Sequence, residues 1–215
     1  MAILEKRSYS FDVLASETGD GEKIITGRPI VYNSRTNLGD FDEVIDAGAL
    51  DKADLTDIRF LVNHDTSMIP LARSRRNNGN STMKLTPDGE GLNLDFVKLD
   101  TENNSDARSL YSAVSRGDVT GMSFMFFVDG EKWENLESEH PVRHITAISR
   151  VLEVSAVTWP AYESTEIYAR SEASALESAK SVLEKARAEF RATLVETSEL
   201  DLLKEKTKIL GGLTK

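Results

Sequence analysis

The chain has 215 residues, of which 40% are hydrophobic and 29% charged, a composition typical of one soluble domain with an appendage. Its formal net charge of -10 argues against a nucleic-acid-binding protein, because phosphate binding requires a basic surface. Without cysteine it has no disulfides or thiolate sites, and without a signal-peptide or membrane-length apolar run it is expected to be soluble and intracellular.

The first 170 residues alternate β-prone runs with turn residues, which predicts a mostly β domain. The pattern of a β-hairpin occurs where two such runs flank the turn residues Pro87, Asp88 and Gly89. Strands are expected at 22–32, 58–63, 82–85, 92–96, 122–128 and 150–158. Several short strands with few helices favour a barrel or a sandwich.

One short helix is predicted inside this domain. Asn104 or Ser105 can act as its N-cap, because their side chains accept hydrogen bonds from free backbone N–H groups. Gly117 can end it. The apolar side chains expected on its buried face are Ala107, Leu110, Tyr111 and Val114.

The composition changes near Arg170, since residues 171–208 contain neither glycine nor proline. Apolar residues recur there at three- and four-residue steps, as in an amphipathic helix: Leu176, Ala179, Leu183, Ala186, Phe190 and Leu194. We therefore expect a domain of residues 1–170 and a helical tail of residues 171–215, with Gly211-Gly212 as the helix stop. The apolar stripe of the tail packs either on the domain or on another protein.

Two residues suit acid–base and nucleophilic chemistry. His64 ends a predicted buried strand, where an imidazole can be held rigidly as a general base or serve only as a structural histidine. Ser123 follows Gly121 on a predicted strand whose Met122, Phe124, Phe126 and Val128 side chains point to the opposite face. A serine becomes a nucleophile only when a base removes its proton, and otherwise bonds to backbone.

Glu153 interrupts the apolar run of the last predicted strand. A carboxylate in such a strand requires a partner, because burying it alone is costly. It pairs either with an arginine such as Arg150, or with His64 as the orienting member of a triad, a place for which His144 is the rival. A zinc site is disfavoured, because Pro141 between His140 and His144 opposes the helix such a motif needs.

Seven short motifs follow one another in a fixed order along most of the chain: 25–32, 41–50, 63–65, 70–73, 88–92, 116–124 and 152–161. Each is unspecific alone, but together they resemble the HK97-family phage prohead (capsid maturation) serine proteases, which are related in fold to herpesvirus assemblin. The resemblance implies an α+β fold with a mainly antiparallel β-barrel surrounded by short helices. By motif match, Ser123 is the nucleophile, His64 the base and Glu153 the third triad member.

The resemblance also implies a function: a serine endopeptidase that acts inside the procapsid, in the host bacterial cytoplasm. Its substrates would be scaffold or the scaffold-like segment of the major capsid protein, with the enzyme itself as a further candidate substrate, and no cofactor, nucleic acid or membrane would be involved. The tail then docks on scaffold or on another copy of the chain. The alternatives are a catalytically inactive capsid-assembly or scaffold protein of the same fold and a host hydrolase acting on small esters.

Overall fold

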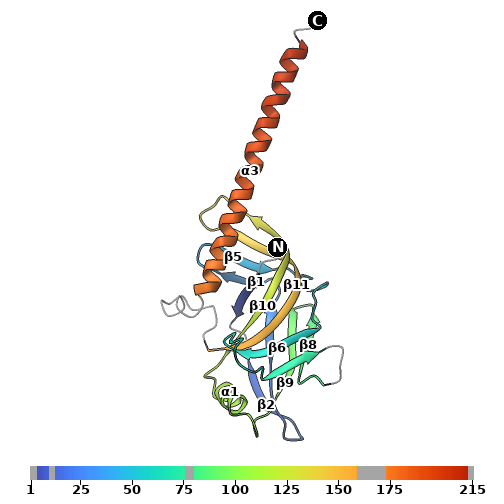
Figure 1. Ribbon diagram of the computed structural model, residues 1–215, viewed down its shortest axis with the longest axis vertical. Coiled ribbons are helices and arrows are strands. Elements are labelled where there is room, and N and C mark those ends of the chain that lie inside the picture. Colours follow the sequence, from blue (N-terminus) through green and yellow to red (C-terminus); the bar gives the residue numbers. More distant parts are fainter. Residues whose placement is uncertain (1–3, 10–12, 76–79, 159–172, 213–215) are drawn as a thin grey trace.

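The computed structural model describes residues 4–9, 13–75, 80–158 and 173–212. A β-rich body carries one long helix, α3 (Ala173–Gly212), which runs along one end of the body and then projects away from it (Figure 1). The expected domain boundary near Arg170 and the motif residues 159–161 lie outside the described part of the chain.

The larger sheet has seven strands, built around the long antiparallel pair β10–β11. Strand β1 pairs with the outer edge of β10, while β5 and β6 pair in parallel with successive parts of β11. Strands β4 and β7 extend β5 and β6. The bounds are β1 Leu4–Tyr9, β4 Arg35–Asn37, β5 Asp42–Ile45, β6 Asp57–Val62, β7 Ala72–Arg75, β10 Gly121–Glu134 and β11 Val142–Val157.

The smaller sheet has four antiparallel strands in the order β2 (Leu14–Glu17), β3 (Lys23–Val31), β9 (Gly91–Leu99) and β8 (Met83–Asp88). The predicted hairpin is confirmed as β8–β9, in which Asp88 lies opposite Gly91 and accepts its N–H at 3.0 Å. Gly91 has a φ of 143°, and a Cβ there would lie 2.0 Å from the carbonyl oxygen of Ile30. Only glycine lets β3 and the turn approach so closely.

One hydrophobic core joins the inner faces of the two sheets and helix α1 (Ser105–Ser115). The predicted helix is confirmed: the Asn104 side chain accepts from the N–H groups of Asp106 and Ala107, and Gly117 follows the helix with a φ of 76°. Fully buried members of the core include Ile25, Ile30, Ile58, Phe60, Phe124, Phe126, Val151 and Val154.

The fold is α+β with mostly antiparallel strands, as expected, but the strand pairs of the described residues form two open sheets and no closed barrel. A closed barrel needs every edge strand to find a second partner, and β7 and β8 each pair with one strand of their own sheet. Four register shifts between β10 and β11 bend this pair. Six successive residues, 121–126, are buried, so both faces of this part of β10 are covered.

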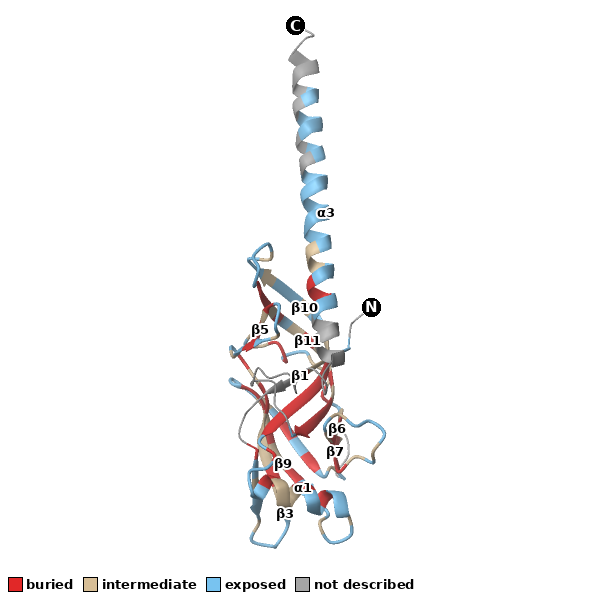
Figure 2. Cartoon of the chain, turned by 90° about the vertical axis from the view of Figure 1, so that its left-hand side faces the viewer, coloured by how far each residue is buried: buried red, intermediate tan, exposed pale blue. Residues whose placement is uncertain are grey.

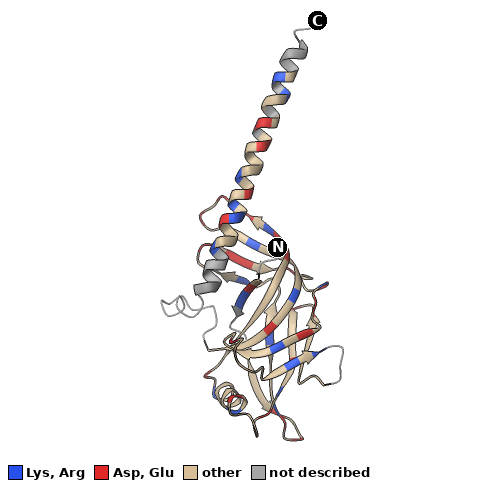
Figure 3. Ribbon diagram, in the orientation of Figure 1, with Lys and Arg blue, Asp and Glu red and all other residues tan. Residues whose placement is uncertain are grey.

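The long helix is docked near its start and exposed beyond it (Figure 2). Val182 and Leu183 are buried, with Leu183 packed on Phe41, and Arg187 donates to the carbonyl oxygens of Leu136 and Ser138 at 3.2 and 2.7 Å. Charges of both signs occur along the projecting part (Figure 3). Its large exposed apolar residues are Phe190, Leu194, Val195, Leu200, Leu202 and Leu203.

Among the described residues, no helix combines the length and apolar composition that crossing a membrane requires.

Candidate active site

Three neighbouring strands of the larger sheet bring the predicted site residues together. Ser123 lies on β10 directly opposite Ser155 of β11, and Ser155 in turn lies beside Leu61 of β6. The Ser123 Oγ atom is in hydrogen-bond contact with Nε2 of His64, and the His64 Nδ1 atom contacts Oε1 of Glu153. Side chains 59 and 89 residues apart in sequence thus form one continuous polar chain.

His64 is aimed at Ser123 by a tight turn at the end of β6. Asn63 and His64 both have positive φ, 51° and 57°, and the Asp65 N–H closes the turn on the Val62 carbonyl at 3.1 Å. Asparagine tolerates this left-handed conformation, whereas the same conformation in histidine is uncommon and requires support from its surroundings. The Asn63 side chain provides part of that support, because it accepts the backbone N–H of Thr158 at 3.0 Å.

Ser155 is a further member of the cluster that the sequence analysis missed. Its hydroxyl donates to Oε2 of Glu153 at 2.6 Å and accepts the backbone N–H of His64 at 3.1 Å. It therefore fixes both the carboxylate and the turn that carries the imidazole. The spacing in the sequence could have indicated this role. Residues two apart on a strand share a face, and Ser155 follows Glu153 at that spacing.

The Ser123 hydroxyl has one proton and two acceptors within reach, Nε2 of His64 and the carbonyl oxygen of Arg7. When a Glu153 carboxylate accepts from Nδ1 of His64, Nε2 is free to accept that proton once Oγ turns from the Arg7 carbonyl. Ser123, Glu153 and Ser155 are buried, which keeps bulk water from competing for these bonds. The arrangement can take a proton from Ser123 Oγ and stabilise the imidazolium that results.

The two rival arrangements are not formed. Arg150 lies next to Asp54, with 3.4 Å between Nε and the carboxylate, and not next to Glu153. His144 lies toward the other end of β11, where its Nδ1 is 2.7 Å from Asp46. Partial burial acts to raise the pKa of Asp46, but hydrogen bonds with His144 and Lys132 outweigh it and lower that pKa. Within the described residues, no group of three or more candidate ligands is arranged to hold a metal ion.

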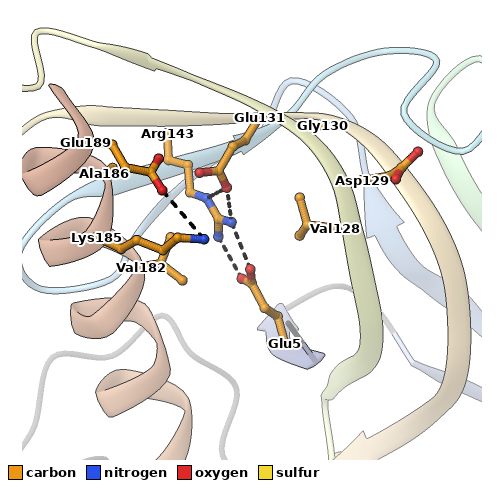
Figure 4. A pocket seen from close by; sticks show the side chains of 10 residues that line it. All are labelled: Glu5, Val128, Asp129, Gly130, Glu131, Arg143, Val182, Lys185, Ala186 and Glu189. Atoms are coloured by element: carbon orange, nitrogen blue, oxygen red, sulfur yellow. Dashed lines mark hydrogen bonds and ion pairs between the residues drawn. The ribbon is translucent and has the colours of Figure 1, made fainter. Parts of the chain in front are cut away.

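A second buried cluster lies beside the first and consists of ion pairs (Figure 4). The Arg7 guanidinium donates to both carboxylate oxygens of Glu43, and Arg143 donates to Glu5, Glu43 and Glu131. This end of the sheet faces the docked part of α3 across a crevice that Lys185 and Glu189 also line. The clusters meet at β1, because the Arg7 carbonyl oxygen accepts from Ser123 Oγ at 2.6 Å.

Comparison with known proteins agrees with the motif-based resemblance. The family model described as Caudovirus prohead serine protease matches residues 9–180, which include His64, Ser123, Glu153 and Ser155. Searches of curated proteins and of solved structures return no match. Because the match covers most of the sequence, the chain belongs to the Caudovirus prohead serine protease family.

Proposed function

We propose that Ser123, His64 and Glu153 are the catalytic triad of a capsid-maturation endopeptidase. The observation that supports it best is the unbroken contact from the Ser123 hydroxyl through the His64 ring to the Glu153 carboxylate. A buried serine bonded only to backbone would have no base to activate it. Membership of a serine protease family makes a nucleophilic serine the expected centre of the chemistry.

The proposed reaction is acyl transfer in two steps. His64 Nε2 removes the Ser123 proton while Oγ attacks the peptide carbonyl carbon, and His64 then gives that proton to the leaving amine. Water, deprotonated by the same nitrogen, attacks the acyl-enzyme and releases the second product. Glu153 accepts from Nδ1 of His64 and stabilises the imidazolium, while Ser155 holds Glu153 in position. Backbone N–H groups near Gly121 are expected to bind the oxyanion.

The proposed substrates are scaffold protein or the scaffold-like segment of the major capsid protein, cleaved inside the procapsid in the host bacterial cytoplasm. The tail, residues 171–215, is proposed to bring the enzyme there by binding scaffold or another copy of the chain. The exposed apolar side chains of α3 beyond residue 189 support this role, because a helix that projects from its own domain leaves them uncovered.

Co-expression with the cognate major capsid protein tests the proposal, with the intact enzyme compared to Ser123→Ala by mass spectrometry. We expect a shortened capsid protein with the intact enzyme and the full-length protein with the variant. An inactive assembly protein would leave the capsid protein whole in both samples. Turnover of small esters without cleavage of capsid protein would point to the esterase alternative.

A further inference from the structure

Strand β1 covers the nucleophile in this structure. Ser123 is 0% exposed, and β1 lies along the edge of β10 that β11 leaves open, with Ser8 opposite Ser123. Acyl transfer requires a substrate carbonyl at Ser123 Oγ, yet the carbonyl that Oγ contacts here belongs to Arg7 of the same chain, at 2.6 Å. A peptide substrate therefore needs the space that β1 occupies.

The side chains of β1 are matched to two buried charges of the body. Arg7 binds the Glu43 carboxylate through two guanidinium nitrogens, a geometry that selects for a planar cation. Glu5 accepts from Nη1 and Nη2 of Arg143 at 2.6 and 2.8 Å. All four side chains are buried, so β1 contributes an acidic residue and, two positions later, a basic one to a complementary pair of subsites.

The ionic side chains of β1 favour its exchange for a peptide. Glu5 and Arg7 are buried but charged, so water can hydrate them after release, unlike the apolar side chains of an ordinary core strand. Glu43 and Arg143 contact each other at 2.9 Å independently of β1, so each has an opposite charge beside it that does not belong to the strand. The family match begins only at Tyr9, the last residue of β1.

We propose that β1 is an internal occupant of the substrate site, and that a peptide of the pattern acidic-x-basic replaces it as a strand on β10. The basic side chain of the peptide binds Glu43 and its acidic side chain binds Arg143, so the basic residue supplies the carbonyl that Ser123 attacks. Main-chain pairing to β10 gives affinity, and the two ionic subsites give specificity. This inference rests on the proposed triad for its catalytic consequence, but the binding it describes can be measured without catalysis.

A reversible cross-link tests whether β1 must leave. Leu4 and Phe127 lie opposite each other on β1 and β10, and the chain has no cysteine of its own. The full-length double variant Leu4→Cys/Phe127→Cys can therefore form only the disulfide that fastens β1, at a separation that cross-strand pairs allow. Fluorescence anisotropy then compares the oxidised and reduced forms of this one protein with a labelled peptide of the β1 sequence, LEKRSY. We expect the reduced form to bind at least about tenfold more tightly.

A second variant weakens the contacts of β1 with the body, where the disulfide fixes the strand in place. Glu5→Gln/Arg7→Gln removes the ionic contacts of β1 and leaves Glu43 and Arg143 to the added peptide, so we expect its affinity for LEKRSY to exceed that of the wild type by about tenfold or more. The matched peptide LQKQSY has uncharged glutamine at both subsite positions and the same net charge, and it should bind the loosened variant at least about tenfold more weakly than LEKRSY. If that variant fails to fold, the cross-linked protein still decides the question.

The outcomes separate this inference from the proposed function. Equal binding by the oxidised and reduced forms, or no binding by either, overturns the replacement of β1 whether or not the protein is a peptidase. Peptide binding that depends on release of β1, without cleavage of the peptide or of capsid protein, supports the replacement and removes the proposed peptidase role. Cleavage at equal rates in the locked and unlocked states supports the peptidase and excludes the replacement.

Discussion

The β10–β11 pair carries a buried polar cluster toward each of its two ends, and the clusters differ in kind. Toward the Ser123 end, residues 121–125 face 153–157, and a hydroxyl, an imidazole and a carboxylate form a chain with Ser155 as support. Toward the Arg143 end, residues 131–134 face 142–145, and two arginines lie among three glutamates. Burial alone therefore does not distinguish a site that transfers protons from one that only holds charges.

The difference lies in which groups can change their protonation near neutral pH. Burial acts to lower the pKa of Arg7 and of Arg143, but the surrounding carboxylates outweigh it and raise both. Burial acts to raise the pKa of Glu5, and the two arginines reverse that shift and lower it. Arg7, Arg143 and Glu5 are thus held in their charged forms and can only orient their neighbours. At the Ser123 end the imidazole of His64 contacts a hydroxyl, so it can accept and return a proton, whereas His144 near Arg143 contacts Asp46 and lies outside the arginine–glutamate cluster.

The largest expected effect is on turnover at the Ser123 end. Replacing Glu153 by Gln keeps the size of the side chain but offers His64 an amide, which no longer fixes its tautomer as a carboxylate does. We expect turnover to fall by about 10⁴-fold, the loss known for the orienting aspartate of chymotrypsin-type enzymes, with little change in melting temperature. Peptide hydrolysis and thermal unfolding measure the two quantities.

Asp46→Asn is the matched control, because Asp46 also contacts a histidine but does so at the other end of β11. Turnover of this variant should stay within a few-fold of the wild type. An equal loss in both variants would mean that the carboxylates act through the fold and not through the proton chain.

The next effect is on stability, at the Arg143 end. Arg143→Met removes the cation that Glu5, Glu43 and Glu131 share and leaves two of these carboxylates buried. Breaking one side of a buried ionic network destabilises a protein by about 3–5 kcal/mol. Denaturant unfolding should show this loss, whereas Arg191→Met on the exposed surface of α3 should change the free energy of unfolding by less than about 0.5 kcal/mol. Similar values for the two variants would contradict the importance of the buried network.

A smaller effect is expected for Ser155→Ala. It removes one hydrogen bond to Glu153 and the acceptor of the His64 N–H, without removing a member of the proton chain. A lost buried hydrogen bond costs about 1–3 kcal/mol, so we expect turnover to fall by about 10- to 100-fold with KM nearly unchanged. Ser155→Thr keeps the hydroxyl and should restore part of the rate. A failure of threonine to restore any rate would point to packing and not to the hydrogen bonds.

The sequence predicted the members of the Ser123 end better than those of the Arg143 end. His64, Ser123 and Glu153 each break a local pattern, since each is polar at the end or in the middle of an apolar run. The hairpin β8–β9 and the cap at Asn104 are also local and were predicted from the residues themselves. Features of this kind depend on neighbours that are close in sequence.

The remaining features depend on pairings between distant segments. Arg143 meets Glu5 across 138 residues and Glu43 across 100, and no local pattern marks either contact. The strands predicted at 122–128 and 150–158 are shorter than β10 and β11, because bulges near Gly130 let the pairing continue to Glu134 and Val142. The cover that β1 places over Ser123 is likewise a consequence of strand pairing and leaves no signal in the sequence of either strand.

The smallest effect on stability is expected from shortening α3, and it separates the two parts of the helix. A chain that ends at Arg191 keeps Val182, Leu183 and Arg187, which anchor α3 on the body, and loses only the projecting segment. Its free energy of unfolding should lie within about 0.5 kcal/mol of the full chain, because exposed side chains contribute little to stability.

A chain that ends at Arg170 is the matched comparison, because it also loses the contacts of Val182, Leu183 and Arg187 and should be clearly less stable. If the projecting segment binds scaffold or a second copy, the chain ending at Arg191 cleaves peptide normally but is no longer packaged with procapsids. Normal packaging of that chain would contradict the binding role. A large loss of stability in it would show that the outer half of α3 packs on the body after all.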